Sequence, residues 1–121
     1  LKTIYKPEIG TIWKAPNNLW TNNFAKNKDP NDFHPAIVEK LKGDNISVQL
    51  APGTTKEYKK GSCVFKTDLA GKGKESFFLL KLSMPYIIDE LLNLDSGWDD
   101  ITALNESQLK DFIWQIKICK G

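Results

Sequence analysis

The stretch FHPAIVEKLKGDNISVQL, residues 33–50, decides the fold because it holds two apolar runs on either side of a turn. Pro35–Leu41 is rich in aliphatic and β-branched residues, and Asn45–Leu50 alternates apolar and polar residues with a period of two. Between them, the Gly-Asp-Asn sequence that begins at Gly43 has the residue types that turns favour. The stretch therefore predicts an antiparallel hairpin whose second strand, Asn45–Leu50, has one buried face and one solvated face.

Further strands are predicted on both sides of this hairpin. Ile9–Lys14 is a short β-branched and aromatic run, Cys63–Lys66 is a short apolar run, and Ser76–Leu82 is typical of a buried strand. Between the hairpin and these later strands, Pro52 and Gly53 predict that Ala51–Lys56 breaks the sheet.

Residues 15–33 form a long polar stretch with six asparagines and two prolines. A loop of this length in a compact domain is usually functional. Two aromatic residues within it, Trp20 and Phe24, are interpreted either as anchors that pack the loop or as platforms on which bases stack. We favour the anchor role for Phe24 and leave both roles open for Trp20.

The last third of the chain predicts helices. Pro85 is suited to the first turn of a short helix that carries apolar residues on one face. Asn105 and Gln108 form a capping-box pattern at the start of a second helix. Its apolar stripe consists of Leu109, Phe112, Ile113 and Ile116. Strands followed by helices predict a mainly β or α+β fold, a small curled sheet or barrel with a C-terminal helix.

The composition of the 121 residues fits one domain with a real core, since 40% are hydrophobic and 11% aromatic. All seventeen basic residues are lysines, so a mechanism that needs an arginine of this chain is excluded. The net charge of +2 is unevenly distributed, at +6 over residues 1–81 and −4 over residues 82–121. This asymmetry indicates either a face that meets a polyanion or a solvated surface with uneven lysines.

Membrane spans, metals and disulfides are not expected. No apolar run approaches the roughly 18 residues of a membrane span. Cys63 and Cys119 fit no metal spacing, and the chain has one histidine. We expect the two cysteines to be partly buried thiols in a reducing cytoplasm rather than a disulfide.

Four motifs follow one another along the chain, at Gly10–Trp13, Phe33–Val38, Pro52–Lys56 and Ala103–Leu109. Their order resembles that of the PemK/MazF family of toxin endoribonucleases. Gly10–Trp13 resembles the family's opening strand, and Phe33–Val38 its Arg-Pro-Ala-Val-Val strand. Pro52–Lys56 lies where the family has a Thr-Thr or Thr-Ser turn, and Ala103–Leu109 resembles the entry to its last helix. The resemblance covers roughly residues 8–120 and implies a single domain over residues 1–121. Its SH3-like barrel would span about residues 8–82 and its helical part about residues 84–119.

The resemblance also implies a function and partners. The implied function is metal-independent cleavage of single-stranded RNA without a cofactor. The implied partners are an antitoxin protein and a second copy of the chain, in a homodimer with a positively charged groove. The chain departs from the family at one position, because His34 replaces the arginine that stabilises the reacting phosphate.

Cleavage without a metal needs a base, an acid and donors to the phosphorane. His34 has the one side chain here whose ordinary pKa allows proton transfer near neutrality. Thr54 and Thr55 carry hydroxyls that can bind phosphate oxygens, and Lys56 supplies positive charge. These four residues are the predicted catalytic set, although no second proton-transfer group is evident. Each also has a structural interpretation, as a packed histidine, a turn or a solvated lysine.

The predicted RNA-binding residues are Lys59, Lys60, Tyr58 and Trp20. Lysines next to an aromatic side chain suit phosphate contacts beside a stacked base, although such clusters are often simply solvated. Two functions therefore stand: a toxin-like endoribonuclease, and a non-catalytic SH3-like barrel that binds nucleic acid or a protein partner. A cysteine hydrolase that uses Cys63 and His34 lacks supporting spacing.

Overall fold

The computed structural model describes residues 7–20, 28–29, 31–43, 46–54, 63–68, 75–93 and 102–120. The strands are β1 (Thr11–Pro16), β2 (Phe33–Leu41), β3 (Ser47–Thr54), β4 (Val64–Asp68), β5 (Glu75–Leu79), β6 (Met84–Ile87) and β7 (Thr102–Ala103). The helices are the α-helices α1 (Ile88–Asn93) and α2 (Glu106–Lys120), and the 3-10 turns η1 (Asn17–Leu19) and η4 (Leu80–Leu82).

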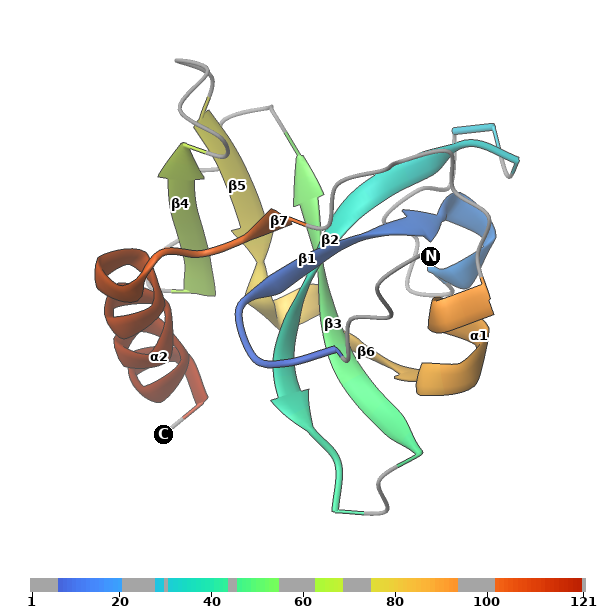
Figure 1. Cartoon of the computed structure of the whole chain (residues 1–121). Coiled ribbons are helices and arrows are strands. Elements are labelled where there is room, and N and C mark those ends of the chain that lie inside the picture. Colours follow the sequence, from blue (N-terminus) through green and yellow to red (C-terminus); the bar gives the residue numbers. More distant parts are fainter. Residues whose placement is uncertain are drawn as a thin grey trace.

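The strands form one curled antiparallel sheet in the order β4-β5-β3-β2-β1-β7, with β6 paired to β3 off this path (Figure 1). One edge of β3 is shared, since Ser47–Leu50 pair with β6 while Gly53 and Thr54 pair with β5. The sheet does not close, because its path ends at β4 and β7. The predicted class is confirmed: the chain is mainly antiparallel β in a small barrel-like arrangement, with a C-terminal helix.

The predicted hairpin is confirmed as β2 and β3. Its register runs from Ala36 opposite Pro52 to Val38 opposite Leu50, and resumes with Lys40 opposite Gln49. Glu39 is therefore an extra residue, a β-bulge in β2. Bulges twist a strand and change the direction of a side chain, and this one carries a buried acidic residue.

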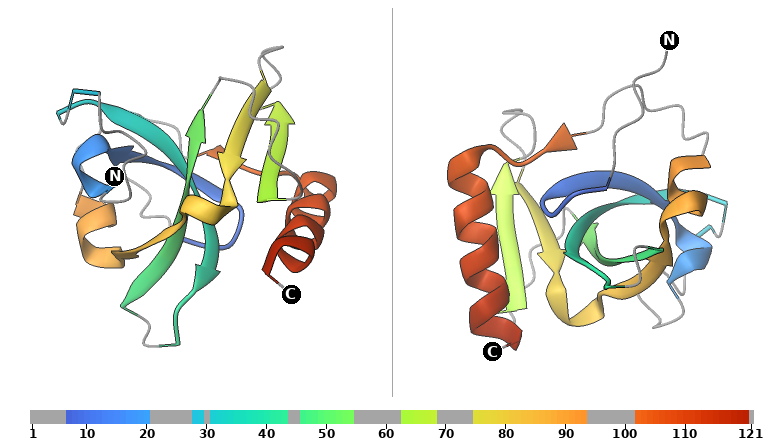
Figure 2. Two further views of the ribbon diagram at one scale, coloured as in Figure 1. Left: turned by 180° about the vertical axis from the view of Figure 1, so that it is seen from behind. Right: turned by 60° about the horizontal axis from the view of Figure 1, so that its bottom comes forward.

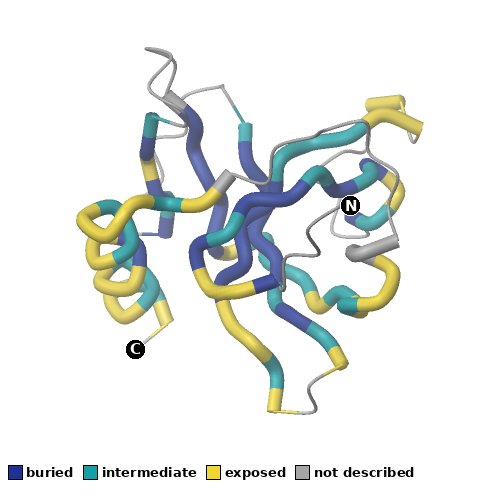
Figure 3. The backbone as a smooth tube through the Cα atoms, in the orientation of Figure 1, coloured by how far each residue is buried: buried dark blue, intermediate teal, exposed yellow. Residues whose placement is uncertain are grey.

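Two apolar clusters lie on the two faces of the β2–β3 hairpin. Ala36 and Val38 belong to the cluster that includes Trp13 and Leu50, whereas Ile37 belongs to the one that includes Phe112. This division follows from the alternation of side chains along a strand. Figure 3 shows the buried backbone concentrated in the central strands, while α2 is largely exposed on its outer side.

The predicted break at Ala51–Lys56 is wrong over its first four residues, because β3 continues to Thr54. Gly53 is needed here for space rather than for a turn. A Cβ on this residue would lie 2.7 Å from Cε1 of Phe78 and 3.2 Å from Cγ of Pro35. The close approach of the Phe78 ring to the backbone therefore requires glycine within the strand.

The short helix predicted from Pro85 begins later than expected. Met84–Ile87 forms β6, in which Pro85 lies opposite Gln49, and α1 starts at Ile88. Among the described strands, β6 pairs with β3 alone, so it is an edge strand. Proline, which has no backbone N–H, is tolerated in an edge strand. Pairing with β3 outweighs the local preference for a helix.

The predicted capping box of α2 is confirmed. The Gln108 backbone N–H donates to Asn105 Oδ1 at 2.8 Å, and the Asn105 N–H donates to Gln108 Oε1 at 3.0 Å. Of the predicted stripe, Phe112 is fully buried and its ring centroid lies 4.9 Å from that of Phe65 in β4. Ile113 is 39% exposed, so the stripe faces the protein only in part. Figure 2 shows α2 beside β4.

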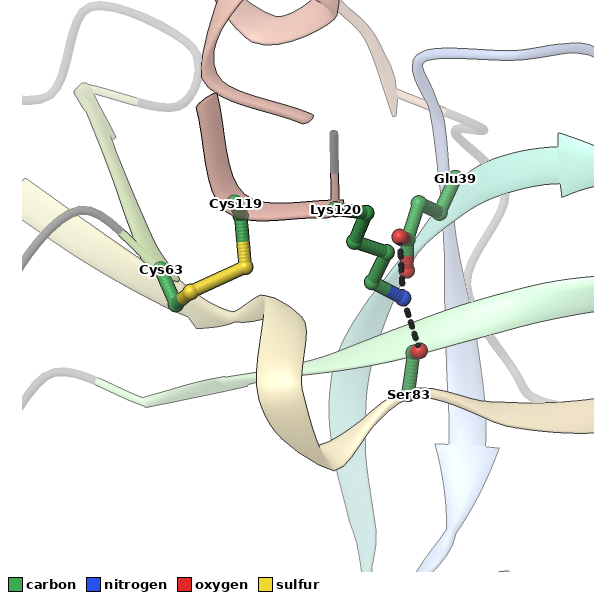
Figure 4. Close-up of a disulfide and its surroundings, with 5 residues drawn as sticks. All are labelled: Glu39, Cys63, Ser83, Cys119 and Lys120. Atoms are coloured by element: carbon green, nitrogen blue, oxygen red, sulfur yellow. Dashed lines mark hydrogen bonds and ion pairs between the residues drawn. A yellow bond between two sulfur atoms is a disulfide. The ribbon is translucent and has the colours of Figure 1, made fainter. Parts of the chain in front are cut away.

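The expectation of two free thiols is wrong, since Cys63 and Cys119 form a disulfide (Figure 4). Their Cα atoms are 5.0 Å apart although 56 positions separate them in the chain. The packing of Phe112 on Phe65 brings the last turn of α2 next to the start of β4. The bond depends on packing between segments that are distant in sequence, so spacing along the chain gave no signal. No helix in the described part of the chain is long and apolar enough to cross a membrane.

Candidate active site around His34

His34 lies at the start of β2, opposite Ala15 of β1. Alternation along the strand places it on the same face as Ala36 and Val38, at the end of the first apolar cluster. The side chain is half-buried, whereas Asp32, two residues before it, is exposed. One side of the ring therefore faces the first apolar cluster, and the side chain remains partly accessible to solvent.

Asn17 holds the other side of the ring. This residue is 4% exposed and begins the 3-10 turn after β1. Its side-chain Nδ2 donates to the Asp29 carbonyl at 2.8 Å, and its Oδ1 contacts His34 Nδ1 in a short hydrogen bond. Its backbone N–H donates to the Asp32 carbonyl at 2.8 Å, and its carbonyl accepts from the Trp20 N–H at 3.2 Å. Asn17 therefore ties the segment before β2 to the end of β1.

This network determines which nitrogen of His34 carries the proton. A backbone carbonyl can only accept, so the amide NH2 of Asn17 must face Asp29, and its oxygen must face His34. Nδ1 of His34 is then the donor. In the neutral ring, Nε2 carries the lone pair, which is the form that a general base requires.

The surroundings favour the neutral ring. Burial lowers the pKa of His34, and the charge of Lys28 lowers it further, while the charge of Asp32 acts in the opposite direction. At neutral pH the ring is therefore uncharged and able to accept a proton. Lys28 also brings positive charge to this side of the molecule.

Thr54, the other described member of the predicted catalytic set, lies at the end of β3. The ladder between β2 and β3 runs as far as Ala36 and Pro52. Beyond it, Thr54 pairs with Phe77 of β5, and Figure 1 shows this end of β3 leaving β2. The close approach of Gly53 to Pro35 keeps the two strand ends near each other. The structure thus places Thr54 at a neighbouring strand end and not in a shared ladder with His34.

Most of the remaining predicted site residues are not among those that the structure describes. Thr55, Lys56, Tyr58, Lys59 and Lys60 lie outside the described residues. So does Phe24 of the polar stretch.

The prediction of Trp20 as an RNA-stacking residue is wrong. Its side chain is 5% exposed and packs in the cluster of Trp13 and Leu50. A ring enclosed by protein leaves no face for a base, so Trp20 is the anchor of its loop.

One aromatic–lysine pair lies close in sequence to His34 but on the other side of the strand. Lys14 Nζ lies 4.6 Å from the centroid of the Phe33 ring. Neighbouring strand residues point to opposite faces, so this cation–π pair does not line the His34 site. Lys28 is the cation that acts on His34.

Sequence reasoning missed Asn17, which is the residue that orients the histidine. Six asparagines occupy residues 15–33, and nothing in their spacing distinguishes this one. Its position directly after a strand that ends in Pro16 became informative only once β1 was known to extend that far.

The fold and site together define a small, curled antiparallel β protein with a packed C-terminal helix and an asparagine-oriented histidine. Comparison of the sequence with models of known families and with curated proteins finds no match. The function must therefore be argued from the site itself.

Proposed function

We propose that this protein is a metal-independent endoribonuclease that cleaves single-stranded RNA with His34 as its general base. The observation that carries the proposal is the hydrogen bond between Asn17 Oδ1 and His34 Nδ1. It orients the ring and leaves the lone pair on Nε2, in surroundings that lower the pKa.

The reaction uses the 2′-hydroxyl of the RNA as the nucleophile. Nε2 takes the hydroxyl proton, the 2′-oxygen bonds to the adjacent phosphorus, and the bond from phosphorus to the 5′-oxygen breaks. The products are a 2′,3′-cyclic phosphate and a 5′-hydroxyl, with the proton on the departing oxygen supplied by water. Lys28 would offset the charge that builds on the phosphate, as would the predicted Thr54, Thr55 and Lys56.

The partners in this proposal come from the resemblance to the PemK/MazF toxins. They are an antitoxin protein and a second copy of the chain, with action in the cytoplasm. The Cys63–Cys119 bond is more typical of proteins in oxidising compartments. Alkylation of thiols before cell lysis therefore tests the compartment separately from the activity.

The test is cleavage of an unstructured RNA oligonucleotide in the presence of EDTA. We expect a product that ends in a 2′,3′-cyclic phosphate by mass spectrometry, and no product from the matching DNA. His34→Gln should lower the rate at least a hundredfold and Asn17→Ala about tenfold, because the base or its orientation is lost. Asn18→Ala is the matched control, since Asn18 is the exposed neighbour of Asn17.

Intact RNA with the unmodified protein would overturn the proposal. If the protein then still bound the oligonucleotide, the alternative of a non-catalytic RNA-binding barrel would stand. Equal cleavage by the His34→Gln variant would remove His34 from the mechanism.

A further inference from the structure

A second site lies between α2 and the β2–β3 hairpin, where the structure has a cavity of about 530 Å³. This volume lies within the range of pockets that bind small organic molecules. Part of its wall is aliphatic, from Ile9, Ile113 and Ile116. The cavity shares no residue with the His34 site.

Glu39 is the polar residue that makes this cavity unusual. Its side chain is 2% exposed, and the β-bulge at this position sets its direction. Oε1 lies 2.5 Å from Lys120 Nζ, whereas the buried Oε2 has no hydrogen-bond partner among the described residues. A buried carboxylate oxygen without a donor is unfavourable, so a ligand that supplied a donor would bind more tightly for that reason.

The other groups near Glu39 are already engaged with one another. Lys120 Nζ also donates to Ser83 Oγ at 2.8 Å (Figure 4). Gln49 Nε2 donates to the same oxygen at 3.0 Å. This network comes from α2, β3 and the segment before β6, so it holds the carboxylate in place. Since Cys119 directly precedes Lys120, the disulfide fixes the same turn of the helix.

Positive charge surrounds the cavity. Lys40, Lys42 and Lys117 line it in addition to Lys120. Within the described part of the chain, none of these three makes an ion pair. The carboxylate of Glu39 is already paired with Lys120, so the charges of the other three lysines are not offset by it. These lysines therefore favour an anionic group on the ligand, at the solvated side of the cavity.

We propose that this cavity binds a small organic anion with an apolar body and an N–H or O–H donor. The body packs against the three isoleucines, the donor bonds to Glu39 Oε2, and the anionic group lies by Lys40, Lys42 or Lys117. Each part of this ligand answers a specific feature of the cavity: the aliphatic wall, the buried acceptor and the lysines.

The probe for the test is 2-anilinonaphthalene-6-sulfonate, which combines an aromatic body with one N–H and a sulfonate at opposite ends of the molecule. We expect saturable binding of one molecule per chain by fluorescence, with shifts of the Ile113 and Ile116 NMR signals. N-phenyl-2-naphthylamine, which lacks the sulfonate, should bind at least tenfold more weakly. The probe must bind the folded protein, so the titration is made far below the denaturation temperature.

Two variants and one control make the test specific. Glu39→Gln should weaken binding about tenfold, because the charged acceptor is lost. Ile113→Glu should abolish binding, since it places a negative charge in the wall at a residue that is 39% exposed and tolerant of a polar side chain. Lys81→Gln is the control for Ile113→Glu, because both changes make the net charge more negative by one. Lys81 is exposed and lies outside the cavity, so this variant should bind the probe as the unmodified protein does.

The outcomes separate this proposal from the ribonuclease proposal. Absence of saturable binding would overturn the proposed ligand site. So would binding by the Glu39→Gln and Ile113→Glu variants that is as tight as binding by the unmodified protein. His34→Gln should leave probe binding unchanged, so loss of RNA cleavage says nothing against the cavity.

Discussion

The side-chain oxygen of Asn17 accepts a hydrogen bond from Nδ1 of His34, across seventeen positions of the chain. A buried residue of a 3-10 turn thus determines the tautomer of a histidine on a neighbouring strand. The pair is the most informative contact in the molecule, because it joins the fold to the proposed chemistry.

Asn17→Asp is expected to raise the pKa of His34. A carboxylate in the position of the amide favours the charged ring, whereas the amide is neutral. The chain has one histidine, so a proton NMR titration of the ring Hε1 signal reads this pKa without ambiguity. Asn18→Asp adds the same charge at the exposed neighbour and should shift the pKa less. Equal shifts in the two variants would contradict direct contact.

Stability should fall as the pH drops below the ordinary histidine pKa of 6.5. Because burial and Lys28 lower the pKa of His34 in the folded state, the unfolded chain binds more protons between that lowered pKa and 6.5. The contribution of His34 is therefore fully present above pH 6.5 and is lost as the pH falls through the folded pKa. Urea unfolding from pH 8 to pH 5 measures it, with His34→Gln as the reference. A pH dependence identical in the two proteins would refute the assignment.

Removing the disulfide should lower the free energy of unfolding by about 4 kcal/mol. The bond closes a loop with a sequence separation of 56, and the estimate is the loop entropy that it removes from the unfolded chain. The Cys63→Ser, Cys119→Ser double variant and the reduced protein should show the same loss in urea unfolding. The double variant should not respond to dithiothreitol, and a response there would point to another cause.

Gly53→Ala should destabilise the protein by about 1–3 kcal/mol, because the new Cβ would meet the Phe78 ring at 2.7 Å. Gly43→Ala is the control, since a Cβ there meets nothing within 4 Å. Thermal unfolding of both variants makes the comparison. If the two alanines had equal effects, the cost would lie in backbone freedom and not in packing.

Local patterns predicted much of the fold. The period of two correctly predicted the strand from Ser47 to Leu50, although Ile46 is 59% exposed. The capping box at Asn105 was also correct. Both patterns depend on neighbouring residues. Pro52, Gly53 and Pro85 were misinterpreted because proline and glycine usually interrupt structure. Here their roles depend on the Phe78 ring and on the pairing of β6 with β3, which are contacts between distant segments.

The candidate site was less predictable than the fold. His34 was found because a single histidine has a chemistry that no other side chain of the chain shares. Asn17, Glu39 and the Cys63–Cys119 bond were not found, since each depends on contacts across the tertiary structure. Residue type reveals a reactive group, whereas its orientation and burial require the fold.

The bond between Cys63 and Cys119 also determines how the molecule would carry mechanical load. It closes a covalent ring that contains β4, β5, β6, β7 and both α-helices, while β1, β2 and β3 lie outside it. Tension applied at the end of α2 would pass through the sulfur atoms to the start of β4 and would leave the helix unstretched. From Cys63 the load would then pass back along the chain to the end of β3, and not through β4 or β5. Under force between the two ends of the chain, the strands outside the ring would be pulled from the sheet, and the helix would not be stretched while the disulfide is intact.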